Sequence, residues 1–206
     1  MSGPDRPPGR TSPRQRDLLE AATRVVAAAG LRGLTHRAVD REAGLPEGTC
    51  SAYLRTRLAL LTALSEHVAA RFATDIEQVT HRIEEESART GPPGPALAET
   101  SALLRLWLAD PDLLLARMEL TLEGVRQPEL ASVFLRQSEQ LVDLVAHAMA
   151  PVQQVGEDLR ARAATLIAAL DGVLLRALRQ DPDHREEALE TSLALLLEAL
   201  LGEPPA

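Results

Sequence analysis

The 206-residue sequence contains no lysine, a single cysteine and only four aromatic residues. One cysteine excludes an internal disulfide framework and a zinc cluster built from several cysteines. No uncharged apolar run approaches the length of about 18 residues that crosses a membrane. The first thirteen residues also lack the apolar core of a signal peptide. We therefore expect a soluble, cytoplasmic protein that does not depend on disulfides.

The signatures of several enzyme classes are missing as well. The sequence has no glycine-rich phosphate loop, no Gly-x-Ser-x-Gly segment and no Glu-x-x-His pair of the di-iron helix bundles. Glu77, His81 and Glu84 share one face of an expected helix, but such polar sets usually form a solvated surface rather than a metal site. We expect no enzymatic activity, no cofactor and no bound metal.

The basic residues, all of them arginine, are unevenly distributed along the chain. Residues 1–57 carry ten arginines and six acidic residues, a formal charge of +4, whereas residues 58–206 carry twelve arginines and 24 acidic residues, a formal charge of −12. The overall formal charge of −8 therefore conceals a basic N-terminal region on an acidic body. Because nucleic-acid affinity depends on local neutralisation of phosphates, this distribution favours a DNA-binding head.

Residues 34–57 have the pattern of two short helices joined at Ala43-Gly44-Leu45. The second of these helices begins at Gly48-Thr49, where small side chains let the backbone approach a groove and the first amides meet phosphate. Cys50 and Leu54, four residues apart, are expected to pack inward. The pattern is typical of a helix-turn-helix, although an ordinary αα-hairpin has the same spacing.

Residues 14–60 resemble the N-terminal domain of TetR-type bacterial transcriptional repressors. The blocks that carry the resemblance are Leu18-Leu19-Glu20-Ala21-Ala22, Gly30, Thr35, Ala43-Gly44-Leu45, Gly48-Thr49 and the run Tyr53-Leu54-Arg55-Thr56-Arg57-Leu58-Ala59-Leu60. These blocks occur in the order and at the spacing of that family. The resemblance implies a dimeric, sequence-specific DNA-binding regulator, a repressor that a small, largely apolar ligand releases from a palindromic operator.

The helix-turn-helix pattern and the resemblance together predict which residues contact DNA. Thr35 would cap the second helix and bond to phosphate, while Tyr53 and Arg57 would contact phosphate beside the third helix. The structural alternatives are that Tyr53 only covers the surface of the head and that Arg57 only pairs with a nearby acid. The full predicted set is Thr35, His36, Arg37, Glu47, Gly48, Thr49, Ser51, Tyr53 and Arg57.

Four positions of this segment depart from the family pattern. The family usually has tyrosine where Ser51 stands and serine or threonine where Pro46 stands. It usually has small or aliphatic residues at the positions of His36 and Asp40. With the acidic total charge, these departures leave a second function open, that of an all-α effector-binding or interaction protein whose head has lost DNA recognition.

The whole sequence predicts an all-α protein of about nine helices in three segments. Residues 1–13, rich in proline and glycine, are expected to form a disordered basic arm. Residues 14–56 form the helix-turn-helix domain, and residues 57–206 form a helical ligand-binding and dimerisation domain. Proline and glycine separate the helices of this last segment, which are expected at 57–88, 96–109, 111–125, 128–149, 157–180 and 184–201.

The last two of these helices have wide apolar faces, wider than one subunit is expected to bury. We therefore predict a homodimer in which both helices form a four-helix interface across a two-fold axis, as the resemblance also implies. The alternative is that the same residues complete the core of the monomer. The predicted interface residues are Leu166, Leu170, Val173, Leu174, Leu189, Leu193, Leu196, Leu197 and Leu200.

The resemblance also implies a cavity for a small-molecule effector among the middle helices. With so few aromatic residues, leucine, valine and alanine would wall this cavity, which favours a compact apolar ligand over a flat polyaromatic one. Trp107 is the strongest candidate, because its large indole also needs a hydrogen-bond partner. The predicted ligand contacts are His67, Arg71, Trp107, Met118, Glu119 and Phe134, each with core or solvated surface as its alternative.

Overall fold

The computed structural model describes residues 12–90, 96–150 and 158–201 of the chain. Within these ranges the chain forms nine α-helices and no strand, which confirms the predicted all-α class. The helices are α1 (Pro13–Gly33), α2 (His36–Glu42), α3 (Thr49–Tyr53), α4 (Arg57–Thr90), α5 (Ala96–Ala109), α6 (Asp112–Arg126), α7 (Pro128–Met149), α8 (Leu159–Leu178) and α9 (Pro182–Leu201). Residues 1–11 of the predicted arm lie outside the described residues, whereas Ser12 and Pro13 already belong to the start of α1.

Most helix boundaries lie where proline and glycine predicted them. The ranges 96–109 and 128–149 are confirmed without change, and the bounds of α4 and α6 differ from the prediction by at most two residues. α8 begins at Leu159 because the carboxylate of Asp158 accepts the amide hydrogen of Ala161 at 3.0 Å and caps the first turn. α9 begins two residues earlier than predicted, at Pro182, because the first turn of a helix tolerates the missing amide hydrogen of proline.

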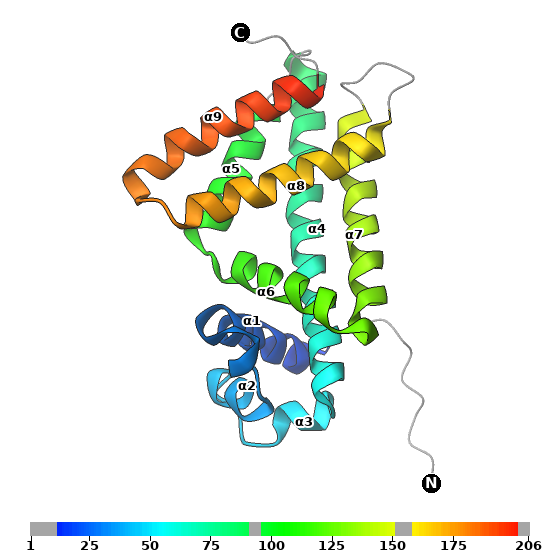
Figure 1. The fold of residues 1–206 in the computed structure, drawn as a ribbon, viewed down its shortest axis with the longest axis vertical. Coiled ribbons are helices and arrows are strands. Elements are labelled where there is room, and N and C mark those ends of the chain that lie inside the picture. Colours follow the sequence, from blue (N-terminus) through cyan, green and yellow to red (C-terminus); the bar gives the residue numbers. More distant parts are fainter. Residues whose placement is uncertain (1–11, 91–95, 151–157, 202–206) are drawn as a thin grey trace.

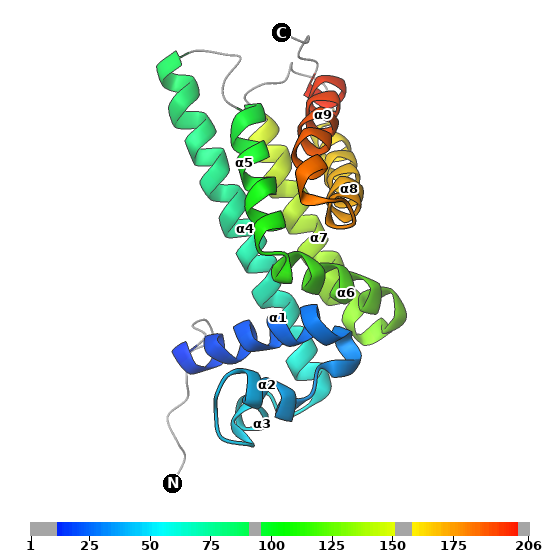
Figure 2. The ribbon, with the colours of Figure 1, turned by 90° about the vertical axis from the view of Figure 1, so that its left-hand side faces the viewer.

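The helices form a head at one end of the molecule and an elongated body above it (Figure 1). α1, α2 and α3 make up the head, and α4 extends from the head along the body beside α5 and α7 (Figure 2). α8 and α9 lie together across one face of the body, the face turned toward the viewer in Figure 1. This arrangement makes α4 a direct mechanical connection between the head and the far end of the body.

α4 is long because its 34 residues contain neither glycine nor proline. The hydroxyl of Thr56 accepts the amide hydrogen of Ala59 at 3.0 Å and caps the first turn. The buried side chains recur on one face of the helix at the four-residue spacing of an amphipathic helix, and they include Leu60, Leu64, Val68 and Phe72.

One continuous apolar core joins the head to the body, extending from Leu18 in α1 to Leu197 in α9. The main contact between the two parts is the packing of α1 on α6. Gly30 interrupts α1 with a φ of 62°, a left-handed conformation in which a side chain would be strained. The next residue, Leu31, directs its amide hydrogen to the carboxylate of Glu119 on α6, with an N to O distance of 3.5 Å. The head (α1 to α3) and the body (α4 to α9), divided at the predicted boundary between residues 56 and 57, therefore share one apolar core.

Several of the apolar residues predicted to form a dimer interface are already buried within the single chain, as the alternative of a monomer core has it. Leu166, Leu174, Leu189, Leu193 and Leu197 are buried between helices of the same subunit, and Leu170, Val173, Leu196 and Leu200 are half-buried. The sequence showed two apolar stripes, but it could not show that α5 and the other body helices cover them. Dimerisation itself remains a prediction.

Candidate nucleic-acid interface and effector site

A buried carboxylate holds the start of α3, the short helix of the predicted reading segment. The Oδ2 atom of Asp40 accepts the amide hydrogen of Gly48 at 2.8 Å, and its Oδ1 atom accepts that of Cys50 at 2.7 Å. Asp40 is only 1% exposed. Amide donors at a helix N-terminus are otherwise unsatisfied, and their partial positive charge stabilises a carboxylate. Asp40, which departs from the family pattern, is therefore the residue that anchors α3 to α2.

The turn between α2 and α3 confirms the predicted hinge at Ala43-Gly44-Leu45. α2 ends at Glu42, and Gly44 follows with a φ of 65°. The amide of Leu45 donates to the carbonyl of Asp40 at 2.9 Å, and that of Gly44 donates to the carbonyl of Arg41 at 3.1 Å. This pair of hydrogen bonds around a left-handed glycine ends a helix by the Schellman arrangement. Glycine at position 44 thus sets the angle at which α3 leaves α2.

The two faces of α3 differ as the sequence predicted. Cys50 and Leu54 are buried in the head, which confirms that they pack inward. Ser51 and Tyr53 are exposed, Tyr53 to 42%. The hydroxyl of Ser51 donates to the carbonyl of Gly48 at 3.0 Å. The outer face of α3 is therefore small and polar, with a single aromatic side chain.

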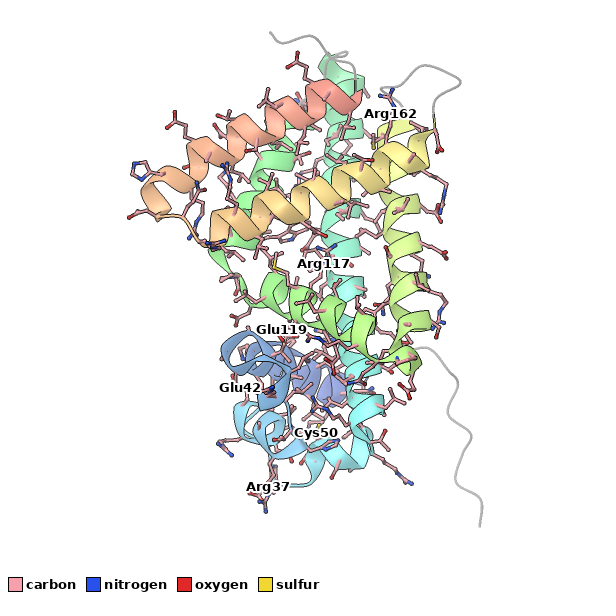
Figure 3. The ribbon with its side chains drawn as sticks, in the orientation of Figure 1. Arg37, Glu42, Cys50, Arg117, Glu119 and Arg162 are labelled. Atoms are coloured by element: carbon pink, nitrogen blue, oxygen red, sulfur yellow. The ribbon has the colours of Figure 1, made fainter. Side chains whose placement is uncertain are left out.

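The N-terminus of α2 lies beside this face. The hydroxyl oxygen of Thr35 accepts the amide hydrogen of Ala38 at 3.1 Å, which confirms Thr35 as the cap of α2. The guanidinium of Arg37 and the carboxylate of Glu47 form an exposed ion pair at 3.4 Å. Figure 3 shows Arg37 directed away from the body at the far end of the head. The structure thus brings the predicted residues of α2 and α3 together on one surface.

Arg57 and His36 have internal hydrogen-bond partners instead. The guanidinium of Arg57 donates to the carbonyls of Leu34 at 2.7 Å and Leu31 at 2.8 Å, so it closes the C-terminal end of α1. The Nε2 atom of His36 lies 2.5 Å from the carbonyl oxygen of Leu54, at the end of α3. The sequence predicts a phosphate contact or, as the alternative, an ion pair for Arg57, and the structure shows backbone carbonyls as its partners. Because every residue has a carbonyl, no sequence pattern identifies such partners.

The surroundings of Cys50 make its thiol unreactive. Burial, and secondarily the negative charge of Asp40, raise the pKa of Cys50 to about 11. We expect native protein at pH 8 to resist labelling by a disulfide reagent such as dithionitrobenzoate and to react fully once it is unfolded in guanidinium chloride.

The same pKa predicts a pH dependence of stability. Because the folded-state pKa of Cys50 lies above its ordinary value of 9.0, the contribution of the neutral thiol to the free energy of unfolding is complete below pH 9 and is lost as the pH rises through about 11.

Labelling of the native protein at the rate of a free exposed thiol would contradict a buried, neutral Cys50 thiol and would make Cys50 a candidate redox sensor.

In the body, four helices bring charged and aromatic side chains together. The guanidinium carbon of Arg117 on α6 lies 5.2 Å from the ring centroid of Phe72 on α4. Both terminal nitrogens of Arg117 also donate to the carboxylate of Asp171 on α8, the Nη2 to Oδ2 distance being 3.1 Å. The ring of Trp107 on α5 meets Phe72 edge-on with centroids 4.6 Å apart, and its indole donates to Asp75 at 2.9 Å. We call these five residues the Arg117 cluster.

Of the six predicted ligand contacts, only Trp107 belongs to the Arg117 cluster, and its hydrogen-bond partner is now identified. Met118 and Phe134 are half-buried against the apolar core, while Glu119 faces the head through α1. Arg71 is exposed, and the pKa of His67 is lowered, first by burial and then by the positive charge of Arg71. The predicted residues therefore do not form one site.

The charged members of the Arg117 cluster have no signature in the sequence. Arg117 and Asp171 are 54 residues apart and occupy ordinary helical positions, so no local pattern distinguishes them from solvated charges. Figure 3 shows Arg117 between α6 and α8 and Glu119 on the opposite side of α6, toward the head. The same helix thus carries a residue of the cluster and a residue of the head contact.

The described ranges contain neither a membrane-spanning helix nor a cluster of metal ligands. Among the described helices, none combines the length and apolar character needed to span a membrane. Within the same part of the chain, no three His, Cys, Asp or Glu side chains converge to hold a metal ion. The His81 ring instead lies 3.2 Å from the carboxylate of Glu85.

Residues 96–202 match the family model described as "Tetracyclin repressor-like, C-terminal domain". Among curated proteins, none matches the sequence of this chain. The solved structure of the multidrug binding protein EbrR, complexed with imidazole, is 28% identical, and the alignment covers 96% of this chain and 98% of EbrR with a TM-score of 0.59. EbrR is also described in complexes with ethidium, proflavin and malachite green.

Two further solved structures have the same architecture. A member of the TetR family from Streptomyces coelicolor A3 is 28% identical, with 90% of this chain and 98% of that chain covered and a TM-score of 0.64. The second is a transcriptional regulator from Rhodococcus sp. Rha1, for which the alignment covers 91% of this chain and 97% of that chain with a TM-score of 0.64. At 22% identity, the second of these bears on the fold alone.

Proposed function

Because this chain belongs to the TetR family of transcriptional regulators, we propose that it is a homodimeric, sequence-specific DNA-binding repressor that a small-molecule effector releases from its operator. The observation that carries the proposal is the anchored reading helix. The carboxylate of Asp40 holds α3 so that its small polar face, with Ser51 and Tyr53, remains exposed at the end of the head. In a head that had lost DNA recognition, a buried carboxylate that fixes the position of α3 would serve no function.

Charge supports the orientation of the head toward DNA. The head and the arm before it are formally basic, whereas the body is strongly acidic. The phosphates of DNA would attract the basic head and repel the acidic body. DNA would therefore approach the outer surface of α2 and α3. We propose that Arg37, Glu47 and Tyr53 contact DNA from this surface with Thr35, Gly48, Thr49 and Ser51, while His36 and Arg57 hold its shape through hydrogen bonds to backbone carbonyls.

The face formed by α8 and α9 supports the proposed dimer. Its exposed positions include small residues that let two helices approach closely, namely Ala161, Ala164, Ala168 and Gly172 on α8 and Thr191 and Ala194 on α9, together with the exposed Leu175 and Leu195. Packing of two such faces about a two-fold axis would place two heads on one side of the dimer. Two heads about 34–36 Å apart would read successive major grooves of DNA. Because a two-fold axis relates the heads, the operator would be palindromic.

The likeness to EbrR supports an effector role for the body. EbrR is described as a multidrug binding protein and is complexed with small aromatic molecules, and it aligns with this chain over nearly the full length of both. We assign DNA binding to residues 14–56 and effector binding and dimerisation to residues 57–206. Because α1 packs on α6 and α4 enters the head, an effector in the body has two helical connections to α3.

Binding of a promoter fragment at several salt concentrations tests the proposal. We expect a fragment from beside the gene to bind far more tightly than random DNA, with an affinity that falls steeply as salt rises. Tyr53→Ala and Arg37→Gln should weaken this binding, and loss of one phosphate contact should reduce the salt slope by about 1. Arg89→Gln, at the opposite end of α4 from the head, is the matched control.

The measurement also decides between the two functions considered. Equal affinity for the fragment and random DNA, with no effect of Tyr53→Ala or Arg37→Gln, would contradict a DNA-binding repressor. It would favour an effector-binding protein whose head no longer reads DNA.

A further inference from the structure

The Arg117 cluster holds a cation between an aromatic face and a carboxylate, and the protein itself supplies that cation. The guanidinium of Arg117 lies over the ring of Phe72 at 5.2 Å and binds Asp171 through both terminal nitrogens. A planar cation over an aromatic face is attracted by the negative charge of the ring face, and a carboxylate beside it adds an ionic attraction. The cluster has the composition of a receptor for a planar cation.

The aromatic part of this receptor is fixed in place. Phe72 is only 3% exposed, so water does not weaken the attraction of its ring face for a cation. Trp107 supports Phe72 edge-on, and Asp75 orients the indole by accepting its hydrogen at 2.9 Å. The four helices α4, α5, α6 and α8 therefore all contribute to the orientation of this ring pair.

The charged part of the receptor is accessible. The side chain of Asp171 is 42% exposed and that of Arg117 is 21% exposed. An entering molecule can therefore reach the ion pair from solvent, and a flexible arginine side chain can leave its position without any change of the backbone. What it would leave behind is a buried ring face beside a carboxylate.

The balance of charge selects the sign of the entering molecule. The Arg117 cluster contains two carboxylates and one guanidinium, and it belongs to the acidic part of the chain. An anion bound to Arg117 would have to displace Asp171 and remain beside it. A cation bound to Asp171 would be attracted by both carboxylates and by the body as a whole.

We propose that the effector is a delocalised organic cation that takes the place of the Arg117 side chain against Phe72 and Asp171. A charge spread over a flat ring system matches the shape of the guanidinium and is more weakly hydrated than a compact ammonium ion. This class of ligand replaces the neutral apolar ligand expected from the sequence. The inference rests on the proposed function only in calling the ligand an effector.

Contacts of α6 connect the position of Arg117 to the head. Arg117 and Glu119 project from opposite sides of α6, and Glu119 accepts the amide hydrogen of Leu31 at the broken end of α1. The carbonyl of Leu31 in turn accepts a hydrogen bond from Arg57 at the start of α4. A shift of α6 on binding would therefore act on the same backbone segment that Arg57 stabilises.

Wild-type protein and three matched probes test the ligand class. The probes are N-methylquinolinium as the cation, 1-methylnaphthalene as the neutral analogue and 1-naphthoate as the anion. Calorimetry measures the affinities, and the fluorescence of Trp107, the single tryptophan of the chain, reports binding at the cluster. We expect the cation to bind at least about tenfold more tightly than either analogue and to change the fluorescence. Equal or weaker binding of the cation would overturn the proposal.

Two variants separate a binding site from a structural ion pair. Arg117→Met removes the internal competitor and should strengthen cation binding by about tenfold, whereas Asp171→Asn removes the attracting charge and should weaken it by about tenfold. A merely structural pair would make both variants bind more weakly. Arg160→Met and Asp143→Asn, which break another ion pair of α8, should leave the affinity unchanged.

Operator binding, measured separately, distinguishes this proposal from the proposed function. If the operator binds but the cation does not, the effector class is wrong and the repressor stands. If the cation binds with the expected pattern of variants but no DNA is recognised, the cation site stands and the repressor does not.

Discussion

Replacement of Asp40 by alanine is expected to abolish most specific DNA binding while leaving the body folded. The change removes the acceptor of two amide hydrogens, that of Cys50, which is buried, and that of Gly48, which is exposed. The orphaned amide of the buried Cys50 costs about 1–3 kcal/mol, and the N-terminus of α3 loses both hydrogen bonds that hold it in place. Because both heads of the proposed dimer would be affected, we expect operator affinity to fall by about 100-fold or more.

Glu42→Ala is the matched control for Asp40→Ala. Glu42 is an acidic residue of the same helix, and its carboxylate makes an exposed ion pair with Arg24 at 2.6 Å. Exposed pairs of this kind contribute little to stability, so operator binding by this variant should remain close to that of the wild type. Asp40→Asn should lose part of the affinity, because an amide oxygen can accept only one of the two hydrogens in this geometry while its amino group faces the other. Wild-type affinity in Asp40→Ala would show that α3 does not depend on this carboxylate.

Replacement of Arg57 by lysine is expected to destabilise the head although the charge is conserved. The planar guanidinium reaches the carbonyls of Leu31 and Leu34 at once, which a single ammonium group cannot reproduce. Hydrogen bonds to charged groups contribute about 1.5–3 kcal/mol, so denaturant unfolding should show a loss of this order. Operator affinity should fall as a consequence.

The salt dependence of binding distinguishes this role from a direct contact with DNA. If Arg57 acts by holding α1 and α4, then Arg57→Lys lowers the affinity without changing the salt slope. If Arg57 instead neutralises a phosphate, Arg57→Lys retains nearly full affinity and Arg57→Ala reduces the slope by about 1. Arg55→Lys, at an exposed arginine two residues earlier, serves as the control and should behave as the wild type.

Local features of the sequence predicted the helices and the hinge of the head well. Proline at positions 111, 128 and 182 marks three helix starts in the structure to within a residue, because proline is tolerated only in the first turn of a helix. The segment Ala43-Gly44-Leu45 predicts the hinge, and Gly44 in the structure has the left-handed conformation that glycine usually supplies after a helix. The four-residue spacing of Cys50 and Leu54 likewise predicted their burial.

The candidate sites were predicted less completely. From the sequence, Asp40 is only a departure from the family pattern, because its partners are the amides of α3, which have no signature in the sequence. The apolar stripes containing Leu174 on α8 and Leu193 on α9 predict a dimer interface, although neighbouring helices of the same chain cover both residues. A periodic pattern shows that a helix face is buried, but it does not show which surface buries it.

The sequence by itself determined that the protein is helical, that its basic residues are concentrated before residue 58, and that a helix-turn-helix begins at Thr35. Periodicity, charge and turn-forming residues are local properties, so they can be recognised without the fold. Only the tertiary structure decided that Asp40 anchors α3, that Arg57 closes α1, and that Arg117 lies between Phe72 and Asp171. These contacts join residues distant in the chain or involve backbone groups common to all residues, and therefore only the packing of helices reveals them.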